Sequence, residues 1–274
     1  VGDFEDEMIY HFDEYGNVLE TCSLGAKRMT YQQVLCCNDT ILMNNSYLIE
    51  QFSWKDRHLS PFANEKDSMK AMLDCREELA LWYTGEEIVI HDFAKGQRVW
   101  SKNISCQKTN EVFKTYYCEG MISPGRTKIC YRIEEKGYVI VDLQSAKEVL
   151  VANGDWHSFF SPDDRYFSVG GRYYACENGE EIDNPFPFEI MQGLTFYNTC
   201  MVRSRGSLMA VLQCKFGNVG NVPVQIWDYD RRELLAEIID PFVVKNVNYA
   251  FTQNSLVMHT DYGVVSIYNC CDKL

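Results

Sequence analysis

Apolar and polar residues alternate over short stretches along the whole chain, and turn-forming residues interrupt the alternation roughly every eight to twelve positions. Three stretches share one order, an apolar strand, an Asp, a short polar turn and a second strand: 87–101, 137–151 and 223–238. Residues 8–22 follow the same plan, 173–183 follow it in a shortened form, and 263–270 supply a first strand only. Alternation with a period of two is typical of antiparallel strands, and long helical periodicity is absent. The pattern predicts an all-β fold.

A second module precedes these hairpins and occurs six times. It consists of a short turn, an apolar strand and another turn; its clearest copy is SPDDRYFSVGG at 161–171. The other copies begin at Asp74, Ser123, Cys37, Ser204 and Thr252, so that successive copies start 37 to 49 residues apart. This period is close to the ~40–45 residues of a four-stranded propeller blade.

The strand count predicts a single β-propeller over residues 1–274, built from four-stranded antiparallel blades. The N-terminal hairpin contributes two strands, five complete blades about twenty, and the last segment three. A ring has to close, because an open end leaves an unpaired sheet edge. We therefore expect the N-terminal strand, about 8–22, to pair with the C-terminal blade, about 247–270. This arrangement favours six blades; seven result if flanking residues belong to the fold.

The repeat resembles the WD-repeat propeller family over nearly the whole chain. Trp227-Asp228, in VQIWDYDRRELLAEI, stands where the signature dipeptide of that family ends the third strand, and 161–171 is similar to its turn between the first and second strands. The chain departs from the family pattern in two ways: it has no Gly-His dipeptide, and only one blade carries Trp-Asp. The His/Asp/Trp network that braces many blades of that family is therefore expected to be missing from most blades of this chain.

The charge balance narrows the classes of partner. The chain has 274 residues, 46% of them hydrophobic, and a formal net charge of -13. Nucleic acids and anionic membranes are not expected partners, because neutralising phosphates needs clustered Lys and Arg. A protein or peptide partner agrees better with this negative charge, and in one version of the hypothesis that partner is basic.

The cysteines and the hydropathy pattern predict an intracellular, cytoplasmic protein. The twelve cysteines include no C-x-x-C pair, and two adjacent pairs are awkward to bridge, so we interpret them as reduced. The first residues are acidic and do not look like a signal peptide, and no apolar run of about 18 residues occurs.

No motif points to catalysis, a metal or a cofactor. The sequence contains no G-x-S-x-G, no H-E-x-x-H and no Cys/His cluster with zinc spacing. Asp163 and Asp164 follow Ser-Pro, where Asp side chains form turns by accepting bonds from nearby backbone N–H groups. Trp227 is expected to pack against the neighbouring blade.

What can carry function is a set of aromatic and basic residues in the loops before the innermost strands, because such propeller loops converge on one face. The candidates are Trp54, Arg57, His58, Tyr116, Tyr117, Trp156, His157, Phe196, Tyr197 and Tyr249. The first hypothesis is a non-catalytic interaction or scaffold module that belongs to a larger chain or complex and binds a protein or peptide on one face. The alternative is a propeller hydrolase or lactonase with carboxylates or a metal in its central channel.

Overall fold

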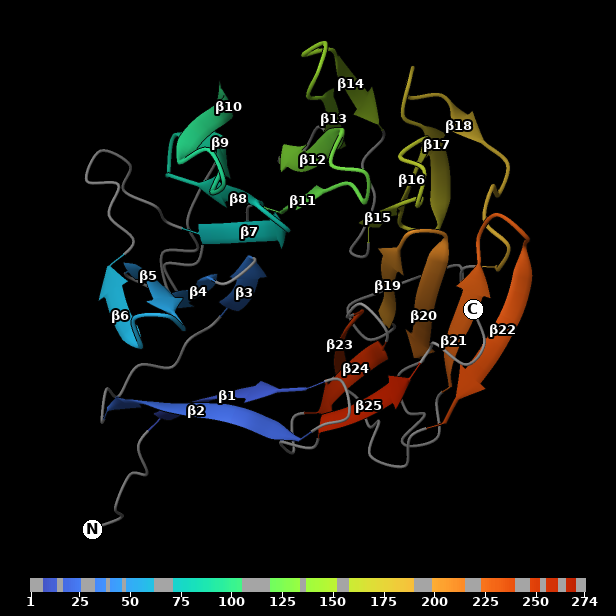
Figure 1. The fold of residues 1–274 in the computed structure, drawn as a ribbon. Helices are drawn as coiled ribbons and strands as arrows, with labels where there is room; N and C mark the ends of the chain where they lie inside the picture. The colour runs from blue at the N-terminus through green and yellow to red at the C-terminus, as the bar shows by residue number, and fades with distance from the viewer. Residues whose placement is uncertain are drawn as a thin grey trace, which may run out of the picture. The chain divides into compact units, whose positions relative to one another are not determined.

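The computed structural model describes residues 7–13, 17–25, 33–37, 40–45, 48–61, 71–104, 119–133, 137–151, 158–189, 199–214, 223–239, 247–251, 255–260 and 265–269. Every regular element in this described part is a strand (Figure 1). The strands form separate antiparallel sheets, most of them four-stranded, and in each sheet consecutive strands are neighbours. The prediction of an all-β chain of four-stranded sheets is confirmed.

The chain divides into two compact units, and the first contains three of the four-stranded sheets. This unit consists of Val1–Tyr10, Glu20–Ile122 and Arg126–Ala152. Its strands are β3 (Gln33–Cys37), β4 (Thr40–Asn45), β5 (Leu48–Ser53) and β6 (His58–Pro61); β7 (Ala71–Arg76), β8 (Leu79–Tyr83), β9 (Glu87–Asp92) and β10 (Gln97–Asn103); β11 (Gly120–Ile122), β12 (Lys128–Ile133), β13 (Gly137–Asp142) and β14 (Glu148–Val151). The first strands of successive sheets contact one another, β3 with β7 and β7 with β11.

The second unit contains two four-stranded sheets and one of three strands. It consists of His11–Leu19, Ser123–Gly125 and Asn153–Leu274. Its strands are β15 (Ser158–Phe160), β16 (Tyr166–Val169), β17 (Arg172–Ala175) and β18 (Glu181–Ile182); β19 (Thr199–Arg205), β20 (Leu208–Cys214), β21 (Val224–Asp228) and β22 (Glu233–Ile238); β23 (Val247–Phe251), β24 (Ser255–Thr260) and β25 (Val265–Asn269). Here too a first strand packs on the next, β19 on β23.

A separate N-terminal hairpin is formed by β1 (Glu7–Phe12) and β2 (Val18–Gly25), which pair only with each other in the described part. Its residues are divided between the two units. The predicted pairing of this hairpin with the C-terminal sheet, and the number of blades, therefore stay predictions. The hairpin at 8–22 and the strands predicted within 87–101, 137–151 and 223–238 are present in the structure.

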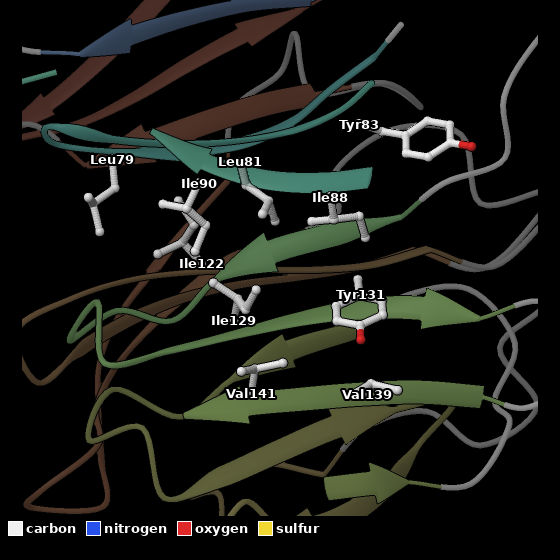
Figure 2. Close-up of a cluster of buried hydrophobic side chains, with 10 residues drawn as sticks. All are labelled: Leu79, Leu81, Tyr83, Ile88, Ile90, Ile122, Ile129, Tyr131, Val139 and Val141. Carbon is white, nitrogen blue, oxygen red and sulfur yellow. The ribbon is translucent and has the colours of Figure 1, made fainter. Parts of the chain in front are cut away.

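The core of the first unit lies between the faces of adjacent sheets. Leu81 and Ile90 project from the β7–β10 sheet toward Ile129 and Val141 of the β11–β14 sheet (Figure 2), and all four are fully buried. Gly120 in β11 permits this approach, because a Cβ there would stand 3.0 Å from side-chain carbons of Leu73 and Leu81. The buried side chains come mainly from the second and third strands of the two sheets, β8, β9, β12 and β13, so these strands form the core between them.

Two further clusters hold the second unit together. One joins the β15–β18 and β19–β22 sheets and is rich in aromatic rings, among them Phe159, Tyr173, Phe186 and Phe188. The other joins the β19–β22 and β23–β25 sheets through aliphatic side chains such as Leu212 and Leu256. Each unit is thus a series of sheets stacked face to face.

Candidate interaction surface

The strand order gives each sheet two chemically different ends. Because the strands alternate in direction, the chain enters the first strand at the same end at which strands two and three are joined. We call this the leading end. The turns between strands one and two and between strands three and four lie at the opposite, trailing end.

Carboxylates brace the trailing-end turns between strands three and four. Asp142, at the end of β13, accepts hydrogen bonds from the backbone N–H groups of Gln144 and Ser145, at 3.2 and 2.8 Å. Asp228, at the end of β21, accepts bonds from the N–H groups of residues 230 and 231, and Asp92 accepts one from that of Lys95. The side-chain bond from Lys95 lowers the pKa of Asp92 below its usual value. These Asp side chains are therefore used to fold the turns.

The N-terminal hairpin has the same turn chemistry. Asp13 follows β1 and accepts bonds from the backbone N–H and the side-chain amide of Asn17, each 2.8 Å long. The turn of this hairpin is therefore braced by an Asp carboxylate, as are the turns after β9, β13 and β21.

The ionisation of Asp142 should make the free energy of unfolding depend on pH. The backbone N–H of Ser145 and the ammonium of Lys128 hold its pKa at about 2, against 3.8 for the unperturbed group. A lowered folded-state pKa contributes stability that is complete above the unfolded value and is lost as the pH falls from about 4 to about 2. Asp142→Asn should lower the free energy of unfolding by about 1 kcal/mol near neutral pH. It should also flatten the acid limb of the stability curve, which is the fall in that free energy below about pH 4.

Chemical denaturation at a series of pH values, on the wild type and Asp142→Asn, measures this effect. Asp230→Asn, which changes an exposed carboxylate beside β22, is the matched control and should keep the wild-type acid limb. An unchanged acid limb in Asp142→Asn would contradict the assignment.

The two acidic residues after Ser-Pro have different roles. Asp163 accepts bonds from Ser161 Oγ at 2.6 Å and from the backbone and side chain of Arg165, so the predicted turn is confirmed for this residue. Burial opposes its ionisation, but these bonds prevail and keep the pKa of Asp163 below its usual value. Burial and the charge of Asp163 raise the pKa of Tyr229 to about 12.

Asp164 is not a local turn former, and this is a correction. Its carboxylate accepts bonds from Ser123 Oγ at 2.7 Å and from the backbone N–H of Gly125 at 2.8 Å, both in the same unit but about 40 positions earlier in the sequence. Asp164 and Ser123 are both buried. Their bond joins two first-to-second-strand turns.

Trp227 packs between sheets, as predicted. Its ring lies 5.9 Å from that of Phe188, which follows β18 of the preceding sheet, and its Nε1–H donates to Gln225 Oε1. Trp227 and Asp228 therefore serve the fold.

Three of the predicted binding residues lie at a different end from the one expected. Trp54, Arg57 and His58 belong to the β5–β6 region, so they lie at a trailing end and not in a loop before a first strand. The expected loop position was wrong because β5 and β6 are the third and fourth strands of their sheet, while the role of these residues in binding stays a prediction. Trp54 packs edge-on against Phe52, with ring centroids 5.1 Å apart, and the guanidinium of Arg57 lies 3.8 Å from the carboxylate of Glu20.

Most of the other candidates lie outside the described residues. Tyr116 and Tyr117 precede β11 in the sequence, Trp156 and His157 precede β15, and Phe196 and Tyr197 precede β19. Tyr249 lies within β23 itself. The expectation that these residues gather on one face therefore stays a prediction.

The sequence analysis missed a pair of arginines on β19. Arg203 and Arg205 are exposed, whereas Val202 and Ser204 between and beside them are buried. The signal is visible in the sequence as MVRSR, where basic residues occupy alternate positions of a predicted strand.

Comparison with known proteins supports the fold and leaves function open. No protein-family model matches the sequence, and no curated protein matches it. The fold is similar to that of a chain in a crystal structure of the mitotic checkpoint complex, with a TM-score of 0.61 and 10% sequence identity, over 93% of this chain and 79% of the other. In all, 1031 chains of solved structures match, and so widely shared a fold does not specify one activity.

Nothing in the described part of the chain gathers metal ligands. Among those residues, no three His, Cys, Asp or Glu side chains lie close enough together to hold an ion. The buried carboxylates of Asp92, Asp164 and Asp228 are bonded to backbone N–H or hydroxyl groups. No helix within the described ranges is long and apolar enough to cross a membrane.

Proposed function

We propose that this chain is a non-catalytic protein-interaction module built as a β-propeller. The observation that carries the proposal is the stacking of consecutive antiparallel sheets through their first strands, β3 on β7 on β11 in one unit and β19 on β23 in the other. A propeller is a ring of such sheets. The similarity to a chain that crystallised within a multi-protein complex supports a protein as the partner.

The edge of β25 supports closure of the ring by the N-terminal hairpin. The fourth strands of the complete sheets carry features that discourage further pairing, such as the bulges in β10 and β22 and the Pro at the end of β6. β25 stands in the third position of its sheet, pairs with β24 without a bulge and contains no charged residue or Pro. Such an edge requires a further strand, and we propose that residues 8–22 provide it.

The roles of the buried acidic side chains favour a binding function over a catalytic one. The buried carboxylates of Asp92, Asp164 and Asp228 hold turns and join sheets, which leaves rigid sheet ends as the feature available for recognition. We propose that the loops before β15 and β19, which both belong to the second unit and contain Trp156, His157, Phe196 and Tyr197, form the binding face. Cys130, Cys176 and Cys200 are buried and not disulfide-bonded, which fits a reducing, intracellular compartment.

Affinity capture with the tagged full chain, followed by mass spectrometry, tests this proposal. We expect at least one protein to be retained in stoichiometric amount, and the double variant Phe196→Ser/Tyr197→Ser to reduce its affinity more than about tenfold, because aromatic residues dominate interface hot spots. Arg57→Ala/His58→Ala, at a trailing end, is the control and should retain the partner. If no protein is retained, or if both double variants retain it equally, the proposed binding face is wrong.

A further inference from the structure

Nearly every cation in the described part of the chain has an anionic or carbonyl partner. Ten Lys and Arg side chains form ion pairs within 4.0 Å: Arg57, Lys95, Arg98, Lys102, Arg126, Lys128, Arg132, Arg165, Arg172 and Arg231. Arg76 and Arg232 donate to backbone carbonyls. In a chain of net charge -13 this is expected, because carboxylates outnumber the cations.

Arg203 and Arg205 differ from the other arginines. Arg203 donates only to the carbonyl of the adjacent Val202, at 3.1 Å, and neither guanidinium has a carboxylate partner among the described residues. Both are exposed on β19, whose register with β20 is continuous from Thr199 to Arg205. Alternate residues of a strand project from the same face about 7 Å apart. The two arginines therefore occupy alternate exposed positions on one face of a regularly paired strand.

We propose that this arginine pair docks an extended acidic segment of a partner protein, in which Asp or Glu residues occupy alternate positions. An extended peptide has the same repeat as β19, so its side chains at i and i+2 are also about 7 Å apart. Each guanidinium can then bind one carboxylate with two parallel hydrogen bonds. The inference rests on the proposed protein-interaction function and adds a contact outside the leading-end loops, because Arg205 lies beside the turn between β19 and β20.

The overall negative charge does not prevent this contact. Exposed charges more than about 8–10 Å apart are largely screened at physiological salt, whereas a directly bonded guanidinium and carboxylate are not. The overall charge should slow association at low ionic strength, and the local pair should hold the bound segment. The partner segment is therefore acidic at the contact, although the partner as a whole can be basic.

Fluorescence anisotropy with a labelled eight-residue peptide tests the pair. The probe alternates Glu with Thr; a second peptide of the same composition has its Glu residues consecutive, and a third has phosphoserine in place of Glu. We expect the full chain to bind the alternating probe, and Arg203→Gln/Arg205→Gln to weaken binding about tenfold. Lys55→Gln/Arg172→Gln removes the same number of exposed charges elsewhere and should bind as the wild type does.

Two further variants make the result independent of folding defects. Arg203→Glu/Arg205→Glu should lose the Glu probe and bind a peptide in which Lys alternates with Thr, and a gain of binding requires a folded protein. Arg205 lies beside the turn, and Arg205→Gln alone should cause part of the loss of affinity for the Glu probe.

The inference is overturned if the wild type does not bind the alternating probe, if the consecutive peptide binds equally well, or if only the phosphoserine peptide binds. Retention of a captured protein partner by Arg203→Gln/Arg205→Gln at wild-type strength would also reject the arginine pair, while the proposed interaction function would stand. Failure to capture any partner would reject the function itself.

Discussion

Replacing Phe186 with alanine should lower the free energy of unfolding of the second unit by about 3–5 kcal/mol. The side chain is 1% exposed, and its ring lies 5.0 Å from that of Phe159, 5.7 Å from those of Phe188 and Tyr173, and 6.2 Å from that of Tyr229. The substitution leaves a cavity at the centre of the cluster that joins two sheets, which close-packed neighbours fill only in part.

Urea denaturation followed by near-ultraviolet circular dichroism measures the loss. Ile239→Ala removes an apolar side chain of similar size that is 59% exposed, and it should change the free energy of unfolding by less than about 0.5 kcal/mol. Phe186→Leu fills much of the cavity and should fall between these two. A loss below about 1 kcal/mol in Phe186→Ala would show that the cluster does not hold the two sheets together.

Local patterns predicted the strands, because the chemistry that makes them is local. In 87–101 the apolar alternation, the Asp and the Gly lie within one hairpin, and the structure places β9 and β10 there with Asp92 bracing the turn. The segment DNPFPFE after β18 shows the limit of such reasoning. Its prolines and polar residues indicate an exposed loop, yet Phe186 and Phe188 are buried against the following sheet. That burial depends on packing between sheets, which local sequence does not encode.

The misplaced binding residues have a specific cause. The segment LIEQFSWKDRHLSP at 48–61 lacks the Asp that ends the third strands β9, β13 and β21, so the sequence pattern places Trp54 in a loop before a first strand. In the structure Ser53 takes that place and accepts a bond from the N–H of Asp56 at 3.3 Å. Without that hairpin the predicted pattern assigns Trp54 to the wrong connection, although the predicted strand count is unaffected.

The fold and the proposed interaction are connected through the sheet ends. An Asp carboxylate bonds the trailing-end turns after β9, β13 and β21. Each described first-to-second or third-to-fourth-strand turn also has one residue in the left-handed region, such as Glu77, Arg57 and Ala146 with φ of 47°, 49° and 57°. This repeated backbone geometry holds strand ends in place at some local cost in strain. A rigid frame of this kind reduces the entropy that a partner has to overcome on binding.

Asp164 joins the turns of two sheets through its bonds to Ser123 and Gly125. We therefore expect Asp164→Ala to lower the free energy of unfolding by about 3–4 kcal/mol. The change removes two bonds to an ionised acceptor and leaves the fully buried hydroxyl of Ser123 without that acceptor. It also keeps a Cβ at a residue whose φ is 59°, where only glycine is free of strain.

Two matched variants separate these contributions to the stability of the turn. Asp164→Gly loses the same bonds but relieves the backbone, so it should be about 1 kcal/mol more stable than Asp164→Ala, and Asp164→Asn, which keeps an acceptor, should lose only about 1–2 kcal/mol. Gly125→Ala places a Cβ 2.6 Å from Asp164 Oδ2 and should disturb the same bond from the other side. In a double-mutant cycle Asp164→Ala and Gly125→Ala should then be less than additive, because each disrupts one shared contact; additive losses in denaturation experiments would show that the two residues stabilise the unit independently.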